Sequence, residues 1–375
     1  MKLATLRYLD GAWSEPFPDL DAEKTLVVAF AAPAYGDRPE LFAELVAAYP
    51  RAAVIGCSTS GEIDQTRIRD GSICVAVIRF EHTRVRYAKA DLRGADRSFA
   101  AGGALADQLA GPGLRSVLVL SRGHDVNGSE LIRGLNAKLS PEVVVTGGLA
   151  GDGDRFGKTY VIGEGIPLRD AVVAVGLYGD RVRVGHGSKG GWDTFGLERV
   201  VTASRGNVLY TLDDRPALAL YKEYLGERAA GLPGSALLFP LSLRASRDAT
   251  ESVVRTVLGV DEATQSMVFA GDIPTGSYAK LMRANFDRLI LGAQDAGHAA
   301  LRDHPLPALC IAISCVGRRL VLGERTEEET EAALEALPRG VEQIGFYSYG
   351  EISPHAAGRC DLHNQTMTLT VISEA

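Results

Sequence analysis

Two octapeptides far apart in the chain indicate its fold: "GCSTSGEI" at residues 56–63 and "GFYSYGEI" at residues 345–352. In both, two glycines stand five residues apart, and a Glu and an Ile follow the second glycine. Glycine permits a positive φ angle and a close approach of the backbone, so this pattern is typical of a tight turn after a strand. The recurrence predicts a structural unit that the chain uses more than once.

The flanking residues repeat the same order of signals. An apolar run at residues 25–32 predicts a buried strand, Asp37 with Glu40 predicts a capped helix start, and Pro50 predicts the helix end. A second copy comprises "LCIAIS" at 309–314, Thr326 with Glu329, and Pro338; a third comprises "SVLVLS" at 116–121, Asn127 with Glu130, Pro141 and the turn "GGLAGDG" at 147–153. These spacings predict a β-α-β-turn-β unit that occurs at least three times.

We therefore expect an α/β protein of two related halves, with mixed sheets and helices packed on their outer faces. A chain of 375 residues exceeds the usual size of one hydrophobic core. The expected parts are an N-terminal extension at 1–24 and two domains at 25–205 and 206–375. A weaker echo of the turn, "FAGDIP" at 269–274, precedes a stretch at 277–303 that we expect to be a helix.

Composition argues against several classes of binding partner and against a location in the membrane. A formal net charge of -7 and a pI near 5.6 argue against nucleic acid and against an anionic membrane surface. No stretch approaches eighteen consecutive apolar residues, so no membrane span is expected. The five cysteines show no metal-ligand spacing, which favours free thiols and a cytoplasmic location.

The exits of the repeated strands are the candidate site, because ligands of α/β proteins gather at the carboxyl ends of strands. The turns carry Glu62, Asp152 and Glu351, while Arg122, His124 and Asn127 precede a predicted helix N-terminus, which favours anions. Familiar motifs fail: "GHGSKG" at 185–190 opens no helix, and "GDGDRFGKT" at 151–159 has the wrong spacing for a phosphate-binding loop. No catalytic motif is found, so we do not expect an enzyme.

These stretches resemble the FIST family, named for F-box and intracellular signal-transduction proteins. The N-terminal pattern of that family resembles "GCSTSGEI", "VNGSELIRGL", "VTGGLAGDG" and "AVVAVGLYG"; the C-terminal pattern resembles "DDRPALALYKEYLG", "FAGDIPTGSYAKLMR", "SCVGRRLVLGERTEEE", "GFYSYGEISP" and "LHNQTMTLTVI". The resemblance implies a cytoplasmic sensory module that binds a small ligand, with amino acids as the suggested class. It also implies signalling through a partner protein.

Carried over by position, the resemblance implies ligand-binding residues in the three turns and the last loop: Cys57, Ser58, Thr59, Gly61, Glu62, Gly148, Asp152, Tyr347, Tyr349, Glu351 and Asn364. Arg122, His124 and Asn127 join this set because they precede a predicted helix N-terminus, which favours anions. An amino acid would suit this set. Glu62 or Asp152 could hold the ammonium group, and backbone N–H groups or Arg122 could hold the carboxylate.

Three other hypotheses stay open. One branch of the family resembles haem-based nitric oxide sensors, in which case His124 would be the iron ligand; otherwise no metal or cofactor is expected. Cys57 could be the nucleophile of a hydrolase or transferase, with His124 as its base. The chain could also be a scaffold whose acidic helix at 327–331 binds a partner protein.

Overall fold

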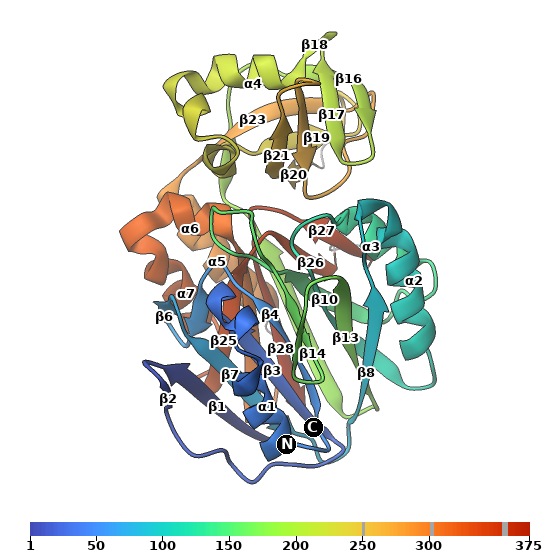
Figure 1. Cartoon of the computed structure of the whole chain (residues 1–375), viewed down its shortest axis with the longest axis vertical. Coiled ribbons are helices and arrows are strands. Elements are labelled where there is room, and N and C mark those ends of the chain that lie inside the picture. The colour runs from blue at the N-terminus through green and yellow to red at the C-terminus, as the bar shows by residue number, and fades with distance from the viewer. Residues whose placement is uncertain (250–251, 301–303, 355–358) are drawn as a thin grey trace.

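The computed structural model describes residues 1–249, 252–300, 304–354 and 359–375. These residues form two lobes (Figure 1). The larger lobe, here called the base, holds three mixed sheets with helices on their outer faces. The smaller one, here called the upper lobe, spans residues 192–284 and holds a fourth sheet. The described part of the chain is thus an α/β protein, as expected.

The first sheet follows the first predicted unit. In spatial order it contains β12 (Ile166–Leu168), β11 (Val161–Gly163), β4 (Ala53–Ser58), β3 (Thr25–Ala31), β7 (Ile73–Arg79), β1 (Lys2–Leu9) and β2 (Ala12–Trp13). Strands β3 and β4 are parallel and are joined through α1 (Pro39–Ala48), whose Leu41, Phe42 and Leu45 are buried. The stretch expected as an extension contributes β1, which pairs along the length of β7.

The second and third sheets are built in the same way. The second contains β27 (Cys360–His363), β26 (Gly350–Pro354), β10 (Val144–Leu149), β9 (Leu114–Ser121), β13 (Ala171–Tyr178) and β8 (Arg84–Asp91), covered by α2 (Ser98–Leu109) and α3 (Gly128–Asn136). The third contains β6 (Arg67–Arg69), β5 (Glu62–Asp64), β25 (Val341–Ser348), β24 (Ala308–Cys315), β28 (Met367–Glu374) and β14 (Val182–Lys189). Helix α5 (Phe286–Ala300) packs against β14 and β28, α6 (Val316–Leu322) follows β24 in the chain, and α7 (Thr326–Glu335) packs against α5.

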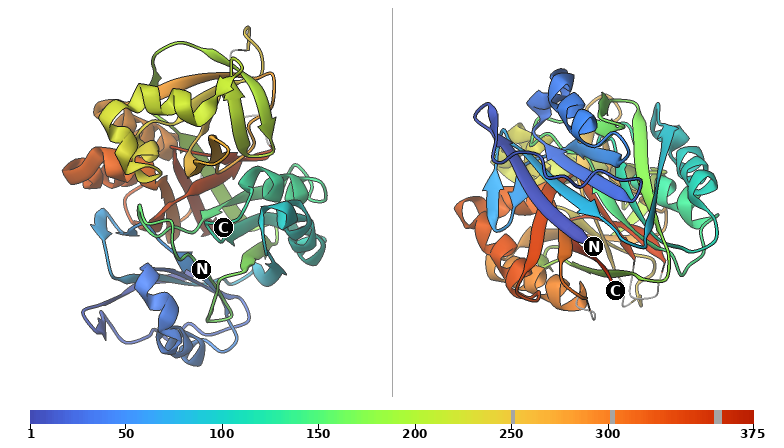
Figure 2. Two further views of the ribbon diagram at one scale, coloured as in Figure 1. Left: turned by 45° about the horizontal axis from the view of Figure 1, so that its top comes forward. Right: turned by 90° about the horizontal axis from the view of Figure 1, so that it is seen from below.

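One strand order is common to all three sheets: a hairpin, a parallel pair, an antiparallel strand and an antiparallel edge. The hairpin always comes from another unit. The hairpin β5–β6 joins β25, β11–β12 joins β4, and β26–β27 joins β10. The sheets therefore interlock around a shared core that includes Leu26, Phe30, Leu118, Ile311 and Phe346. The right-hand view of Figure 2 shows the ribbon of the base from below. This order fits the repeated-unit interpretation, and a common origin of the units stays a prediction.

The fourth sheet is antiparallel throughout its described pairs. Its order is β20 (Val253–Arg255), β19 (Leu241–Arg244), β23 (Tyr278–Ala284), β16 (Arg199–Arg205), β17 (Val208–Leu212), β22 (Ser266–Phe269) and β21 (Val257–Asp261), with β15 (Trp192–Thr194) on β23 and β18 (Arg215–Pro216) on β17. Helix α4 (Ala217–Leu225) covers it, and the upper lobe has its own apolar cluster, which includes Val201, Leu218 and Phe269. None of the described helices is long and apolar enough to cross a membrane.

Of the three helix N-caps predicted from the sequence, one was correct and two were wrong. Asn127 does cap α3, and its Oδ1 accepts from the backbone N–H of Glu130 at 3.2 Å. Asp37 does not cap α1, because the residue at that position is Arg38. Thr326 lies inside α7 and donates its hydroxyl to the carbonyl of Gly323, so it is not a cap either.

The helix expected at 277–303 was wrong in its first half. Residues 278–284 form β23, in which Ala279 and Leu281 are buried while Tyr278 and Lys280 are only half-buried. This two-residue alternation is typical of a strand with one buried face. Helix α5 begins at Phe286, and residues 301–303 lie outside the described part of the chain.

Candidate functional site

The three repeated turns meet at one place in the base. The backbone N–H of Ser60 donates to the carbonyl of Tyr347 at 2.8 Å, and the N–H of Tyr347 donates to the carbonyl of Gly61 at 2.9 Å. The N–H of Gly151 donates to the carbonyl of Ser58 at 3.0 Å. These bonds follow from the exchange of hairpins between sheets, which brings the carboxyl ends of the parallel strands together.

Glu62 and Glu351, the acids of the two octapeptides, have matching surroundings. Glu62 accepts from the hydroxyl of Thr59 and from the N–H and hydroxyl of Ser72, at 2.9 and 2.7 Å. Glu351 accepts from the hydroxyl of Ser348 at 2.6 Å, and from the N–H and hydroxyl of Thr366 at 3.2 and 3.0 Å. Burial raises the pKa of Glu62 to about 7 and that of Glu351 to about 8, against these hydrogen bonds. Each carboxyl group ties its own turn to the next strand.

Asp152, the acid of the middle turn, holds a different loop. Its Oδ2 accepts from the N–H groups of Gly157 and Lys158, both at 2.7 Å, and its Oδ1 accepts from the hydroxyl of Tyr349. Burial alone would raise the pKa of Asp152, but His124 and these donors lower it below its ordinary value. Asp152 is therefore ionised at neutral pH and shapes the loop at 152–159.

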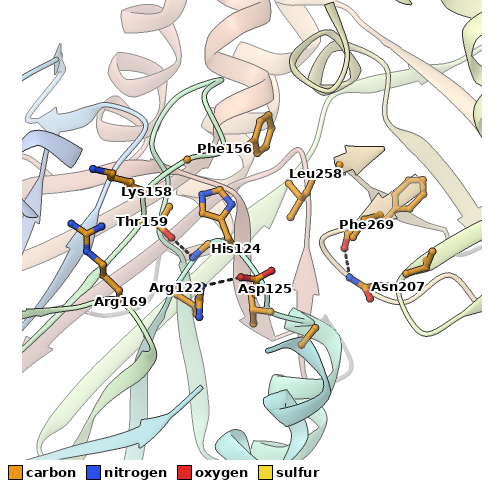
Figure 3. Close-up of a pocket in the computed structure, with 17 residues that line it drawn as sticks. Arg122, His124, Asp125, Phe156, Lys158, Thr159, Arg169, Asn207, Leu258 and Phe269 are labelled. Carbon is orange, nitrogen blue, oxygen red and sulfur yellow. Dashed lines mark hydrogen bonds and ion pairs between the residues drawn. The ribbon is translucent and has the colours of Figure 1, made fainter. Parts of the chain in front are cut away.

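A cavity of about 540 Å³ lies where this loop, the end of β9 and the upper lobe come together (Figure 3). We call it the junction cavity. Its base side carries Arg122 and His124, from the loop between β9 and α3. Nε2 of His124 is buried 3.7 Å from Oδ1 of Asp152, and neither it nor Nε of Arg122 makes a hydrogen bond to the described residues. Both nitrogens are buried, so neither is exposed to the cavity.

The charged residues of the junction cavity are mostly paired. Arg122 forms ion pairs with Asp170 at 2.8 Å and Asp125 at 3.2 Å, and Arg169 forms one with Asp37. Lys158 is exposed, and no ion pair joins it to any described residue. The site therefore offers one cation that a ligand could neutralise.

The upper lobe supplies the opposite wall of the junction cavity, and most of this wall is apolar. It consists of Val208 on β17, Leu258 and Gly259 on β21, Val268 and Phe269 on β22, and the polar Asn207, whose Nδ2 donates to the carbonyl of Phe269 at 2.7 Å. Figure 3 shows Leu258 facing His124 across the cavity, with the ring of Phe156 beside both. Phe156 stacks on Tyr349 at 4.9 Å between ring centroids, so the middle and last turns share an aromatic pair next to the cavity.

A second cavity of about 590 Å³ lies beside the first turn, and we call it the first-turn cavity. Thr59, Gly61, Glu62 and Asp152 line it together with Arg319 of α6. Arg319 donates to both carboxylate oxygens of Asp70 and to the carbonyl of Ser60. The two cavities share Gly157 and Lys158, so the loop at 152–159 is the wall between them.

The other predicted site residues have structural contacts. Cys57 is fully buried in the shared core, and burial raises the pKa of its thiol well above its ordinary value, which disfavours the nucleophile hypothesis. Tyr347 donates to Glu329, which pairs with the buried Arg318. Hydrogen bonds or strand pairing account for the rest: Ser58 accepts from the N–H of Tyr160, Gly148 pairs with Glu351, Asn364 accepts from the N–H of Thr256, and Nδ2 of Asn127 donates to Asp272.

Several residues of the junction cavity were not predicted from the sequence. Lys158 and Phe156 belong to the stretch at 151–159 that failed as a phosphate-binding loop, and no other motif pointed to them. Val208, Leu258 and Val268 come from a different lobe. Apolar strand residues of this kind carry no signal in a single sequence that separates a cavity wall from a core.

The residues around His124 do not fit haem. Its Nε2 lies beside the Asp152 carboxylate, and its ring is packed edge-on against Tyr349 and Phe156, at 5.3 and 6.3 Å between centroids. An iron ligand would need that nitrogen directed into an open slot. Among the described residues no group of three or more His, Cys, Asp or Glu side chains is placed to hold a metal ion.

Comparison with known proteins places the chain in a family. The FIST N domain matches residues 25–215, and the FIST C domain matches residues 217–354. No curated protein matches the chain. The boundary between the matches falls inside the upper lobe, before α4. Because the FIST N match alone covers more than half of the chain, the protein belongs to the FIST family, whose domains are associated with sensing in signal transduction.

Proposed function

We propose that this protein is a sensor that binds a small amino-acid-like ligand in the junction cavity and signals through a partner protein. The observation that carries the proposal is Lys158, a cation that no ion pair joins to any described residue, on the lining of a cavity between two lobes. The cavity lies at the carboxyl end of β9 and before the N-terminus of α3, where α/β proteins commonly bind ligands.

The two ends of an amino acid find complementary groups there. Lys158 can receive the carboxylate, because no ion pair joins it to a described residue, and Asp125, which is exposed on the cavity lining, can receive the ammonium group. Glu62 is a poor partner for the ammonium group, because its oxygens already accept from Thr59 and Ser72. Of the residues expected from the sequence, the proposal thus keeps those of the loop between β9 and α3 and leaves out the first and last turns.

Signalling would follow from the position of the ligand between the lobes. The lobes contact each other beside the cavity: Nδ2 of Asn127 donates to Oδ1 of Asp272 at 2.6 Å, and the N–H of Gly128 donates to the carbonyl of Ala270 at 3.1 Å. A ligand that contacts both walls would favour one arrangement of the lobes over others. A partner protein in a reducing cytoplasm would then detect that arrangement.

Thermal unfolding against the twenty amino acids tests this proposal. A ligand at ~100 times its dissociation constant adds about 2.7 kcal/mol to the native state, and we expect such a shift from one class of amino acid. Lys158→Met should reduce the shift, while Lys2→Met, which removes an exposed lysine of β1, should not. The absence of a shift with every amino acid would contradict the proposal, and so would equal shifts in both variants.

A further inference from the structure

We infer that the junction cavity selects a small monocarboxylate with an apolar side chain, as opposed to a polar or doubly charged ligand. The inference rests on the proposed function, because it concerns the same cavity, and it adds the chemical class of the ligand. Two independent features carry it: the balance of charge on the base side and the composition of the opposite wall.

The charge balance fits a single negative charge. Three cations line the cavity, namely Arg122, Lys158 and Arg169. Asp125 and Asp170 already pair with Arg122, and Asp37 pairs with Arg169. Only Lys158, within the described part of the chain, is left to a ligand. A second negative charge would therefore be desolvated without a partner, which is unfavourable.

The upper-lobe wall fits an apolar group. Val208, Leu258 and Val268 are each half-buried, so part of their apolar surface faces the cavity. Phe156, from the loop at 152–159, is half-buried as well and extends this apolar surface toward the base. Covering such surface releases water and stabilises the complex roughly in proportion to the apolar area buried. A ligand with a polar side chain would lose its own hydrogen bonds to water against this wall.

The two features face each other across the cavity. His124 and Arg122 lie at the base side, and Leu258 lies opposite them (Figure 3). A carboxylate bound to the base side would thus direct its side chain toward the upper lobe. Leucine-sized and phenylalanine-sized side chains suit this geometry, and so do the matching 2-oxo acids, since the argument requires a carboxylate and an apolar group but no amine.

Isothermal titration calorimetry of the full chain tests the inference with five probes: L-leucine, L-phenylalanine, 4-methyl-2-oxopentanoate, L-serine and L-aspartate. We expect the three apolar probes to bind at least about tenfold more tightly than serine and aspartate. If the cavity does not recognise the amine, we expect this preference for the oxo acid alone. Serine or aspartate binding as tightly as the apolar probes would overturn the inference and leave the proposed function standing. If none of the five probes binds, the inference is overturned, while the proposed function fails only if the thermal screen against all twenty amino acids also shows no shift.

Variants on the wall provide the matched test. Val208→Thr and Val268→Thr keep the branched shape of the side chain and add a hydroxyl, and each should weaken the tightest apolar probe by about tenfold. Val260→Thr, on β21 of the same lobe but outside the cavity lining, is the control and should change the affinity less than about twofold. Equal affinities in all three variants would show that the apolar wall does not contact the ligand, and would overturn the inference.

Discussion

A side chain on Gly56, Gly147 or Gly345 would collide with the backbone of a neighbouring strand. These glycines stand on the second strand of each parallel pair, next to the carbonyls of Ala29, Val119 and Ala312 respectively. The carbonyl leaves no room for a Cβ atom, so the first glycine of each repeated turn is required by packing. The recurring glycines therefore reflect how the turns are built.

Gly345→Ala should lower the free energy of unfolding by about 3 kcal/mol, because the neighbouring carbonyl is main chain and cannot rotate away. Gly111→Ala is the control: an added Cβ there meets nothing within 4 Å, and its backbone is not in the positive-φ region. The midpoint of urea unfolding measures both. Equal midpoints for the two variants would contradict the packing account.

The buried carboxyls predict that stability falls as pH rises. The ordinary pKa of a Glu is 4.5, and burial raises that of Glu62 to about 7 and that of Glu351 to about 8. Between these values the folded protein holds a proton that the unfolded chain has released, so the free energy of unfolding decreases with increasing pH. The decrease reaches about 1.4 kcal/mol per pH unit for each carboxyl group.

Urea unfolding at pH 5 to 8 checks this slope. Glu62→Gln should reduce it, because the amide stays neutral and its NH₂ group can donate to the Thr59 hydroxyl after that hydroxyl rotates. Glu335→Gln, on the exposed face of α7, should leave the slope unchanged. A parent whose stability is constant or rises from pH 5 to pH 8 would show that these carboxyls are ionised in the folded state.

Helix α3 contacts the upper lobe through Asn127 and through Ser129, whose hydroxyl accepts from the N–H of Asp272 at 3.2 Å. Oδ1 of Asn127 caps the helix, and Nδ2 donates to Asp272 of the upper lobe. The same helix follows the loop that carries Arg122 and His124. The cap thus orients the loop that forms the base side of the junction cavity.

Asn127→Ala should lower the free energy of unfolding by about 1 to 2 kcal/mol, the usual effect of losing an N-cap. Asp37→Ala, at the position that only seemed to be a cap, should change it by less than about 0.5 kcal/mol, because it removes just an exposed ion pair with Arg169. Urea unfolding distinguishes the two. A larger loss from Asp37→Ala would mean that the sequence pattern identified the cap correctly after all.

At the element scale, apolar runs predicted the buried strands correctly, whereas the polar residues taken as helix N-caps predicted the helix starts less well. The runs at 25–32, 116–121 and 309–314 became β3, β9 and β24, because a continuous apolar run of that length can only be buried. Residues 278–284 were misread, since a strand with one buried face resembles a short amphipathic helix in a single sequence. A Ser, Thr or Asp three residues before a Glu proved ambiguous, because such pairs also occur inside helices and loops.

At the scale of the whole molecule, the three sheets of the base depend on one another. Strands β5, β11 and β26 each complete a sheet begun by another unit, and β14 of the N-terminal part pairs with β28 of the C-terminal part. Such exchange is invisible in the sequence, because it depends on which hairpin reaches which sheet edge. For the same reason the sequence predicted the loop at 122–127 as part of the site but not the upper-lobe residues that complete the junction cavity.

Two fragments test this interdependence. Residues 1–205 should lack a cooperative thermal transition, because several of their strands lose a partner. Strand β5 loses β25, β10 loses β26, and β14 loses β28. Residues 192–284 should fold alone, since their apolar cluster lies entirely within that range. Circular dichroism during heating measures both. A cooperative transition in the 1–205 fragment would show that its sheets do not need the C-terminal strands.

The most direct test of the central claim is a crystal structure of the protein with the amino acid that gives the largest thermal shift. The account predicts ligand density in the junction cavity, with a carboxylate near Lys158 and a side chain against Leu258. Density confined to the first-turn cavity beside Glu62 and Arg319, or located outside both cavities, would contradict it.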